Sequence, residues 1–297
     1  MESLAELRRL IARHAGEGVT RTALDGVVVM ASETTTQPIG SVSEPALAVV
    51  AQGAKRTVLN DSVFAYGAGQ YLIVSVDLPV TAHITDASRE QPFLAVGMTL
   101  RPAAIAALLL ESGPDDQERR SPLGIASSDA TPELLDAIVR LLRLLDHPGD
   151  RRALGPAVER EILWRLITGN HGAMVRQIGL ADSRLSLIGR SVGWLRHHYD
   201  ETVRVDDLAR LSGMSVSSFH RHFRAVTAMT PIQYQKLIRL QEARARLIAD
   251  PHDVAAVAFA VGYESPSQFS REYRRRFGVP PGKDAEQLRA ASAVSDR

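Results

Sequence analysis

The sequence predicts a protein of two parts, an antiparallel β-sandwich or barrel with flanking helices and then an all-α domain. Three observations support this fold class. Short runs rich in Val, Ile and aromatic residues recur between residues 26 and 100, helical periodicity follows over 102–168, and one helical motif occurs twice after residue 190. The length of 297 residues suits about two domains of ordinary size.

The composition excludes several classes of protein. Hydrophobic residues make up 45% and charged residues 23%, which is typical of a packed globular chain. There is no cysteine, so disulfides, thiolate zinc sites and thiol catalysis are all excluded. This usage suits a reducing compartment.

No segment looks like a signal peptide or a membrane span. Charges are scattered through residues 1–14, and the best apolar run, 103–110, is far shorter than the roughly 20 residues that cross a bilayer. We therefore expect a cytoplasmic protein that makes no membrane contact.

The net charge of +1 conceals an asymmetry along the chain. Residues 1–190 contain 19 Lys and Arg against 22 Asp and Glu, whereas residues 191–285 contain 14 against 10. A basic second half suggests a polyanionic partner for that half.

The first part of the chain reads as one helix and then strands. Leu4, Leu7, Leu10 and Ile11 form a helical stripe. Seven segments are then predicted to be strands: 26–31, 46–51, 55–59, 62–66, 71–76, 80–84 and 93–100. Asn60-Asp61 joins two of them as a tight hairpin turn.

Helical signals begin after residue 101. Candidate helices cover 102–111 and 156–168, and Thr131-Pro132-Glu133 starts another with an N-cap, a first-turn proline and an early acid. The stretch after residue 168 has no clear period. The predicted domains are 1–168 for the sheet and its helices, 169–189 for a linker, 190–285 for the helical domain and 286–297 for a tail.

A broad leucine stripe marks the helix that starts at Thr131. It consists of Leu134, Leu135, Ile138, Leu141, Leu142 and Leu145. The stripe could pack on the sheet domain, or it could form a dimer interface. The sequence leaves both open.

Two segments near the C-terminus repeat one pattern. Residues 208–224 and 257–274 each contain an Ala with a Gly four residues later, at Ala209 and Gly213 and again at Ala258 and Gly262. Each then continues as Ser-x-Phe-x-Arg-x-aromatic-Arg, with one extra residue in the second turn.

This repeat has a mechanical interpretation as two helix-turn-helix units. The small Ala allows close helix packing, and the Gly takes the left-handed conformation that ends a helix. Ser215 and Ser265 cap the second helices. Aromatic residues four positions apart anchor those helices to the core: Phe219, Phe223, Phe269 and Tyr273.

The opposite faces of the second helices, about 215–226 and 266–276, are polar and basic and suit the DNA major groove. The candidate DNA-binding residues are Ser217, Ser218, His220, Arg221, Arg224, Ser267, Gln268, Ser270, Arg271, Arg274 and Arg275. Arg221 and Arg271 are the candidates for bidentate contact with guanine, and Arg224, Arg274 and Arg275 for phosphates.

The two units are joined by one predicted helix, from Thr230-Pro231 to about Ala249, which Asp250-Pro251 stops. Such a helix would hold the units at a fixed separation. If both enter one face of DNA, their sites lie about 34 Å or 10 bp apart.

With these motifs, residues 190–283 resemble the DNA-binding domain of AraC/XylS-type transcription regulators, down to Gly262-Tyr-Glu-Ser265 and Phe277-Gly-Val-Pro-Pro281. The resemblance implies that base contacts come from Ser217, His220, Arg221, Ser267, Ser270 and Arg271. One departure is Asp284-Ala285, where the family commonly has an aromatic residue and then Arg; it bears on the C-terminal cap.

Residues 22–180 resemble the N-terminal domain of one branch of this family, most clearly over Tyr66–Pro79. The resemblance implies a cupin-like barrel followed by helices that senses a small molecule or dimerises. If an organic effector enters the barrel, we expect polar contacts from Tyr66, Tyr71 or His83. Packing alone explains these residues equally well.

Two other functions are weighed against a specific regulator. A cupin-type enzyme with an accessory DNA-binding domain would need several metal ligands, but His83 is the only histidine among the predicted strands. An architectural DNA binder would rely on backbone contacts and wedging side chains. We therefore expect a non-enzymatic regulator without cofactor or metal, with promoter DNA, an effector, a second copy of the chain and, if it activates, RNA polymerase as partners.

Overall fold

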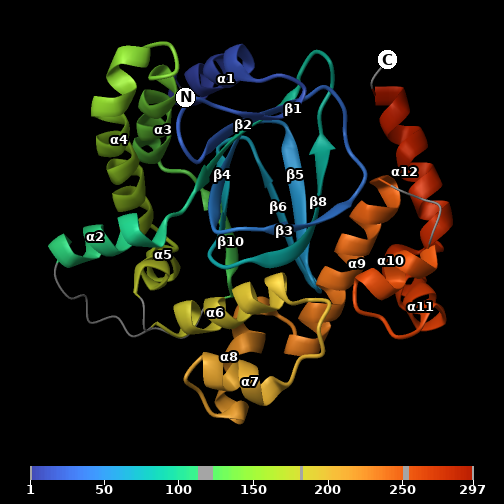
Figure 1. Cartoon of the computed structure of the whole chain (residues 1–297). Helices are drawn as coiled ribbons and strands as arrows, with labels where there is room; N and C mark the ends of the chain where they lie inside the picture. Colours follow the sequence, from blue (N-terminus) through green and yellow to red (C-terminus); the bar gives the residue numbers. More distant parts are fainter. Residues whose placement is uncertain (1, 113–122, 181–182, 250–253, 296–297) are drawn as a thin grey trace. The chain divides into compact units, whose positions relative to one another are not determined.

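The computed structural model describes residues 2–112, 123–180, 183–249 and 254–295. The chain divides into two compact units (Figure 1). The first contains residues 1–189 together with 221–228, and the second contains 190–220 with 229–297.

Two antiparallel sheets form the centre of the first unit. One sheet has the order β1 (Gly18–Arg21), β2 (Val27–Ser32), β9 (Phe93–Thr99), β4 (Ala46–Gln52), β7 (Gln70–Val74) and β10 (Ile125–Asp129). The other has the order β3 (Ile39–Ser43), β8 (Leu78–Asp86), β5 (Ala54–Leu59) and β6 (Ser62–Gly67). The sheets meet where β6 packs against β4, β7 and β10. The predicted antiparallel β-domain is thereby confirmed.

All seven predicted strands are present, and the Asn60-Asp61 turn joins β5 to β6 with Leu59 paired to Ser62. Asn60 takes a φ of 50°, as a tight hairpin turn requires. The strands β1, β3 and β10 were not predicted. Each lies at an edge of its sheet and has only four or five residues with few large apolar side chains, whereas the edge strand β6 carries Val63, Phe64 and Tyr66 and was predicted.

Five helices of the first unit pack on the six-stranded sheet or on one another (Figure 1). These are α1 (Glu2–His14), α2 (Pro102–Ser112), α3 (Pro132–Arg143), α4 (Pro148–Thr168) and α5 (Gly172–Gly179). Thr131 caps α3 as predicted, since its side chain accepts a hydrogen bond from the Leu134 amide at 3.3 Å. Five of the six stripe residues of α3 are buried, so the packing interpretation of the stripe holds.

Two predicted boundaries in this region differ from the structure. The helix expected over 156–168 begins at Pro148, so Pro156 lies inside α4 instead of at its start. The stretch 169–189, expected to be a linker, contains α5 and the beginning of α6 (Arg184–His197). Met174, Val175 and Ile178 form one buried face of α5, a stripe of only three large residues, and packing against α2 and α4 stabilises this short helix.

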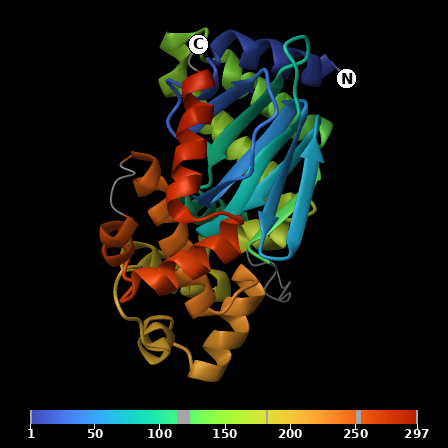
Figure 2. The same cartoon turned by 90° about the vertical axis from the view of Figure 1, so that its right-hand side faces the viewer.

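The second unit is helical. After α6 it comprises α7 (Val205–Leu211), α8 (Val216–Thr227), α9 (Pro231–Ala249), α10 (Val254–Ala260), α11 (Pro266–Phe277) and α12 (Pro281–Ser295). The second half of α8, from residue 221 onward, groups with the first unit. Figure 2 shows α12 alongside α9. A core shared by α9 to α12 is built on Leu240, Leu247, Phe269 and Tyr273. The predicted helix stop at Asp250-Pro251 lies outside the described residues, and α12 covers most of the expected tail.

Among the described residues, no helix combines the length and apolarity that crossing a bilayer requires.

Candidate nucleic-acid interface and effector cavity

The turns of the two helix-turn-helix units have the same construction. After α7, the Gly213 amide donates to the Arg210 carbonyl and the Met214 amide to the Ala209 carbonyl, both at 2.9 Å. After α10, Gly262 donates to Phe259 and Tyr263 to Ala258, at 2.9 and 3.0 Å. These are the paired bonds of a helix that ends at a left-handed residue. Gly213 and Gly262 have φ values of +62° and +85°, as the repeat predicts.

Serine caps start the second helix of each unit. The Ser215 hydroxyl accepts from the Ser218 amide, and the Ser265 hydroxyl accepts from the Gln268 amide, each at 3.4 Å. The anchoring aromatic residues Phe219, Phe223, Phe269 and Tyr273 are completely buried. The cap and the anchors together fix both the start and the rotation of each helix.

Rotation about the buried anchors exposes the predicted DNA-binding faces. Ser217, His220, Arg221 and Arg224 are exposed on α8, and Ser218 is half-buried. On α11, Ser267, Gln268, Arg271, Arg274 and Arg275 are exposed, and Ser270 is half-buried. The structure therefore gathers the predicted residues of each unit on one accessible helix face.

Helix α9 links the two helix-turn-helix units and binds their backbone through two side chains. Arg239 donates to the carbonyl of Gly262 at 2.6 Å and to the carbonyls of Tyr199 and Glu201 at 2.6 and 2.9 Å. Gln235 donates to the same two carbonyls before α7, at 2.9 and 2.7 Å. Helix α9 thus holds both the segment before α7, where the first helix-turn-helix unit begins, and the turn of the second helix-turn-helix unit.

A second group of contacts fixes α11. Glu272 accepts from Lys236 of α9 at 2.7 Å, from the Tyr263 hydroxyl at 2.9 Å and from Gln268 at 3.3 Å. Burial alone would raise the pKa of Glu272, but the three hydrogen bonds outweigh it and hold the pKa below its ordinary value of 4.5. Burial, together with the bond to Glu272, raises the pKa of the Tyr263 phenol, which stays a donor.

Asp284, the residue that departs from the family pattern, has a structural role. Its side chain is 6% exposed and accepts from Arg244 at 2.7 and 3.1 Å and from the Tyr273 hydroxyl at 2.8 Å. Because Tyr273 is an anchor of α11, this bond ties the helix to α12. The departure therefore places a buried carboxylate where α9, α11 and α12 meet.

The structure does not bring Tyr66, Tyr71 and His83 together. Tyr66 faces the four-stranded sheet's inner side, where its hydroxyl lies 3.2 Å from that of the buried Thr57. His83 pairs with Arg56, one position away from Thr57, so it points to the opposite face. Tyr71 belongs to the other sheet, and its ring lies 6.2 Å from that of His171 at the start of α5.

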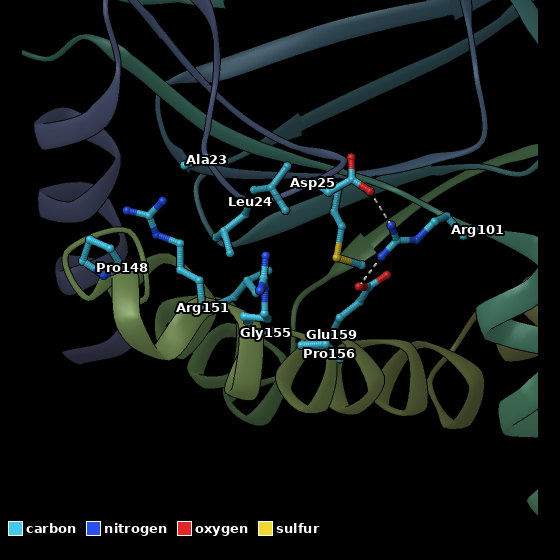
Figure 3. Close-up of a pocket in the computed structure, with 13 residues that line it drawn as sticks. Ala23, Leu24, Asp25, Arg101, Pro148, Arg151, Gly155, Pro156 and Glu159 are labelled. Carbon is cyan, nitrogen blue, oxygen red and sulfur yellow. Dashed lines mark hydrogen bonds and ion pairs between the residues drawn. The ribbon is translucent and has the colours of Figure 1, made fainter.

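A cavity of about 520 Å³ lies elsewhere in the first unit (Figure 3). It is bounded by the turn between β1 and β2, by the end of β9 and by α3 and α4. None of the three predicted ligand-binding residues lines it. The sequence offered one signal that could have found it, the Gly155-Pro156 pair inside a helix.

The comparisons with known proteins agree with this architecture. Residues 23–174 match the family described as AraC-type transcriptional regulator N-terminus, and residues 208–287 match a helix-turn-helix domain. The chain belongs to the AraC family of transcription regulators. This confirms the resemblance seen in both halves of the sequence.

Relatives of this AraC-family protein include the HTH-type transcriptional activator RhaS of Salmonella paratyphi A, which is 28% identical over 160 residues. RhaS of Salmonella newport gives the same identity. The match covers 53% of this chain and 56% of RhaS, so the chain spans about half the length of these curated relatives.

Two solved structures of ToxT from Vibrio cholerae share the fold over most of the chain. An apo variant has a TM-score of 0.55 at 10% identity, covering 89% of this chain and 98% of ToxT. ToxT with a bound unsaturated fatty acid has a TM-score of 0.54 at 9% identity, covering 90% and 97%.

The two turn glycines predict different costs for the same substitution. A Cβ at Gly262 would lie 2.2 Å from the Asp200 carbonyl oxygen, whereas a Cβ at Gly213 meets no atom within 4 Å. Gly213→Ala should therefore cost only the left-handed penalty of about 1–2 kcal/mol. Gly262→Ala should lose a further 1–3 kcal/mol, roughly, through backbone displacement.

Urea unfolding followed by Trp194 fluorescence in a Trp164→Phe background measures this difference, because Trp194 is then the sole tryptophan and lies in α6. Equal losses for the two glycine variants would contradict the observed approach of Gly262 to Asp200.

The contacts of Glu272 predict an acid-sensitive step. Its lowered pKa stabilises the fold at any pH above 4.5, the ordinary value, and this stabilisation disappears as the pH falls through the lower, folded-state pKa. Glu272→Gln should lose about 1–3 kcal/mol at pH 7 and show a flatter acid dependence below pH 4.5.

The matched control is Glu264→Gln, which removes an exposed carboxylate from the turn of the same unit. Unfolding free energies measured from pH 7 to pH 3 should distinguish the two. Parallel pH curves for Glu272→Gln and the unmodified protein would rule out this assignment.

Proposed function

We propose that the protein is a sequence-specific transcription regulator that binds promoter DNA with α8 and α11 in successive segments of the major groove. The observation that carries the proposal is the pair of identically built turns, each followed by a helix with a polar, exposed face. A helix offered in this way is the reading element of helix-turn-helix proteins. The RhaS relatives, which are transcriptional activators, support the same function.

The exposed residues divide into two roles. Arg221 and Arg271 lie in the middle of their helices, and a guanidinium matches the O6 and N7 acceptors of guanine. Arg224, Arg274 and Arg275 lie nearer the helix ends and suit phosphates. The remaining polar residues would refine base choice: Ser217, Ser218, His220, Ser267, Gln268 and Ser270.

The alternatives receive less support. Architectural binders insert apolar side chains between base steps, but the exposed faces of α8 and α11 carry Ser, His, Gln and Arg. The family consists of transcription regulators, which makes the cupin-type enzyme a weaker proposal. We infer that the protein works in the cytoplasm without catalysing a reaction.

The first unit is proposed to respond to a small organic effector and to form a homodimer. An N-terminal effector domain is what the family match implies, and the fold resembles that of ToxT, one structure of which contains a fatty acid. If the protein activates transcription as RhaS does, RNA polymerase is a further partner.

The two arginine classes predict separable defects. Arg221→Ala should cost about 1–3 kcal/mol on the specific site and relax preference at one base, because a bidentate base contact is lost. Arg274→Ala should weaken binding to all sequences alike and lower the salt slope by about one ion. Fluorescence anisotropy against the specific site and a scrambled duplex over a salt series measures both.

Equal losses on both duplexes for Arg221→Ala would contradict its role in base reading. The site itself comes from selecting bound genomic fragments with the purified protein and footprinting the strongest. We expect two adjacent protected major-groove segments that disappear in the Arg221→Ala, Arg271→Ala variant. Uniform, salt-sensitive retention of all fragments would instead favour an architectural role.

A further inference from the structure

The cavity of the first unit has an apolar base. Leu24, Val27, Met98 and Leu141 line it, and each is at least 92% buried. Its volume of about 520 Å³ falls in the range of pockets that hold small organic ligands, roughly 300–1,000 Å³. The cavity lies outside the barrel interior, because the side chains of Val27 and Met98 that line it face α3 and α4.

The helix α4 is shaped around this cavity. Gly155 is buried, yet a Cβ built there would meet no atom within 4 Å, so the glycine opens the wall instead of filling a tight contact. Pro156 has no N–H, so it cannot satisfy the Arg152 carbonyl one turn earlier. A glycine followed by a proline lowers the stability of a helix, and in α4 these two residues leave room for the cavity that they line.

Charged groups surround the apolar base unequally. Arg101 is neutralised on one side of the cavity, because it donates to Asp25 at 2.7 Å and also pairs with Glu159 (Figure 3). These pairs hold the β1–β2 turn to α4. Arg101 is shared by two carboxylates, so this side of the cavity carries one net negative charge.

The other two arginines have no carboxylate partner within the described part of the chain. Arg151 donates to the neutral carbonyls of Leu144 and Leu145 at 3.0 and 3.1 Å. Arg152 is exposed at the edge of the cavity and makes no ion pair there. An apolar base beside two uncompensated guanidiniums suits a ligand with an apolar body and an anionic end.

We propose that this cavity binds a small amphipathic monocarboxylate, with the apolar body on Leu24, Val27 and Met98 and the carboxylate on Arg152, supported by Arg151. The inference rests on the proposed effector function, for which it names a site and a ligand class. The site differs from the barrel interior, where Tyr66 lies.

Binding is tested by titration calorimetry of the full chain with octanoate and 2-naphthoate, each beside its neutral counterpart, octan-1-ol and 2-naphthol. We expect at least one carboxylate to bind more tightly than its alcohol. Arg152→Gln should weaken the carboxylate about tenfold, the effect of one charge-assisted hydrogen bond, and leave the alcohol unchanged. Arg165→Gln, on α4 outside the cavity, is the matched control.

Filling the cavity gives an independent readout. Gly155→Leu should abolish binding of both ligands of a pair, and Ala23→Trp, in the exposed turn at the rim, should do the same without altering α4. Binding that survives both substitutions overturns the proposal. So does equal affinity for carboxylate and alcohol, an Arg152→Gln variant that binds like Arg165→Gln, or no binding by any of the four probes.

The ligand site and its regulatory role are tested separately. A carboxylate that binds in the cavity and shifts the DNA affinity supports both the site and its role as an effector site. A carboxylate that binds without shifting the DNA affinity confirms the site but rejects its regulatory role. Specific DNA binding by the ligand-free chain tests the regulator proposal independently.

Discussion

A single guanidinium organises the DNA-binding unit. Arg239 donates to three backbone carbonyls, two before α7 and one in the turn before α11. Burial lowers the pKa of Arg239, but a guanidinium stays protonated in proteins, so it remains a cation whose donors must be satisfied. Loss of the Arg239 side chain would leave backbone carbonyls of both helix-turn-helix units without these hydrogen bonds. DNA binding by α8 and α11 depends on this constraint, because two recognition helices enter successive major-groove segments only when their separation is fixed.

Much of the fold follows from patterns within single segments. The interior strands, the Thr131 cap and both Gly-containing turns were predictable, since each is determined by local hydrophobic period or by backbone conformation. The short edge strands β1, β3 and β10 were not, because four or five residues with few large apolar side chains carry little hydrophobic pattern. The start of α4 was misplaced because a proline usually marks the first turn of a helix, whereas Pro156 lies inside one.

The site divides in the same way. The exposed residues of α8 and α11 could be predicted because helical period places them opposite buried aromatics. The supporting residues could not be predicted, because Arg239, Glu272 and Asp284 each bond to a residue 36 to 40 positions away, a relation that no local pattern carries. Tyr66, Tyr71 and His83 seemed to share a barrel interior, but strand register turns them to different faces. The cavity needed four separate segments to meet, which only the folded chain shows.

We infer that α9 holds the two recognition helices, α8 and α11, at one fixed separation. The most direct measurement is a footprint on the selected site after inserting half a helical turn, about 5 bp, between its two protected segments. We expect one segment to lose protection and the affinity to fall toward the non-specific level, because the second helix then faces the wrong side of the duplex. Reinserting to a full turn of about 10 bp should not restore it, since the rigid unit cannot span the added length. Protection of both segments on the half-turn site would show that the units move independently and would contradict the role assigned to Arg239.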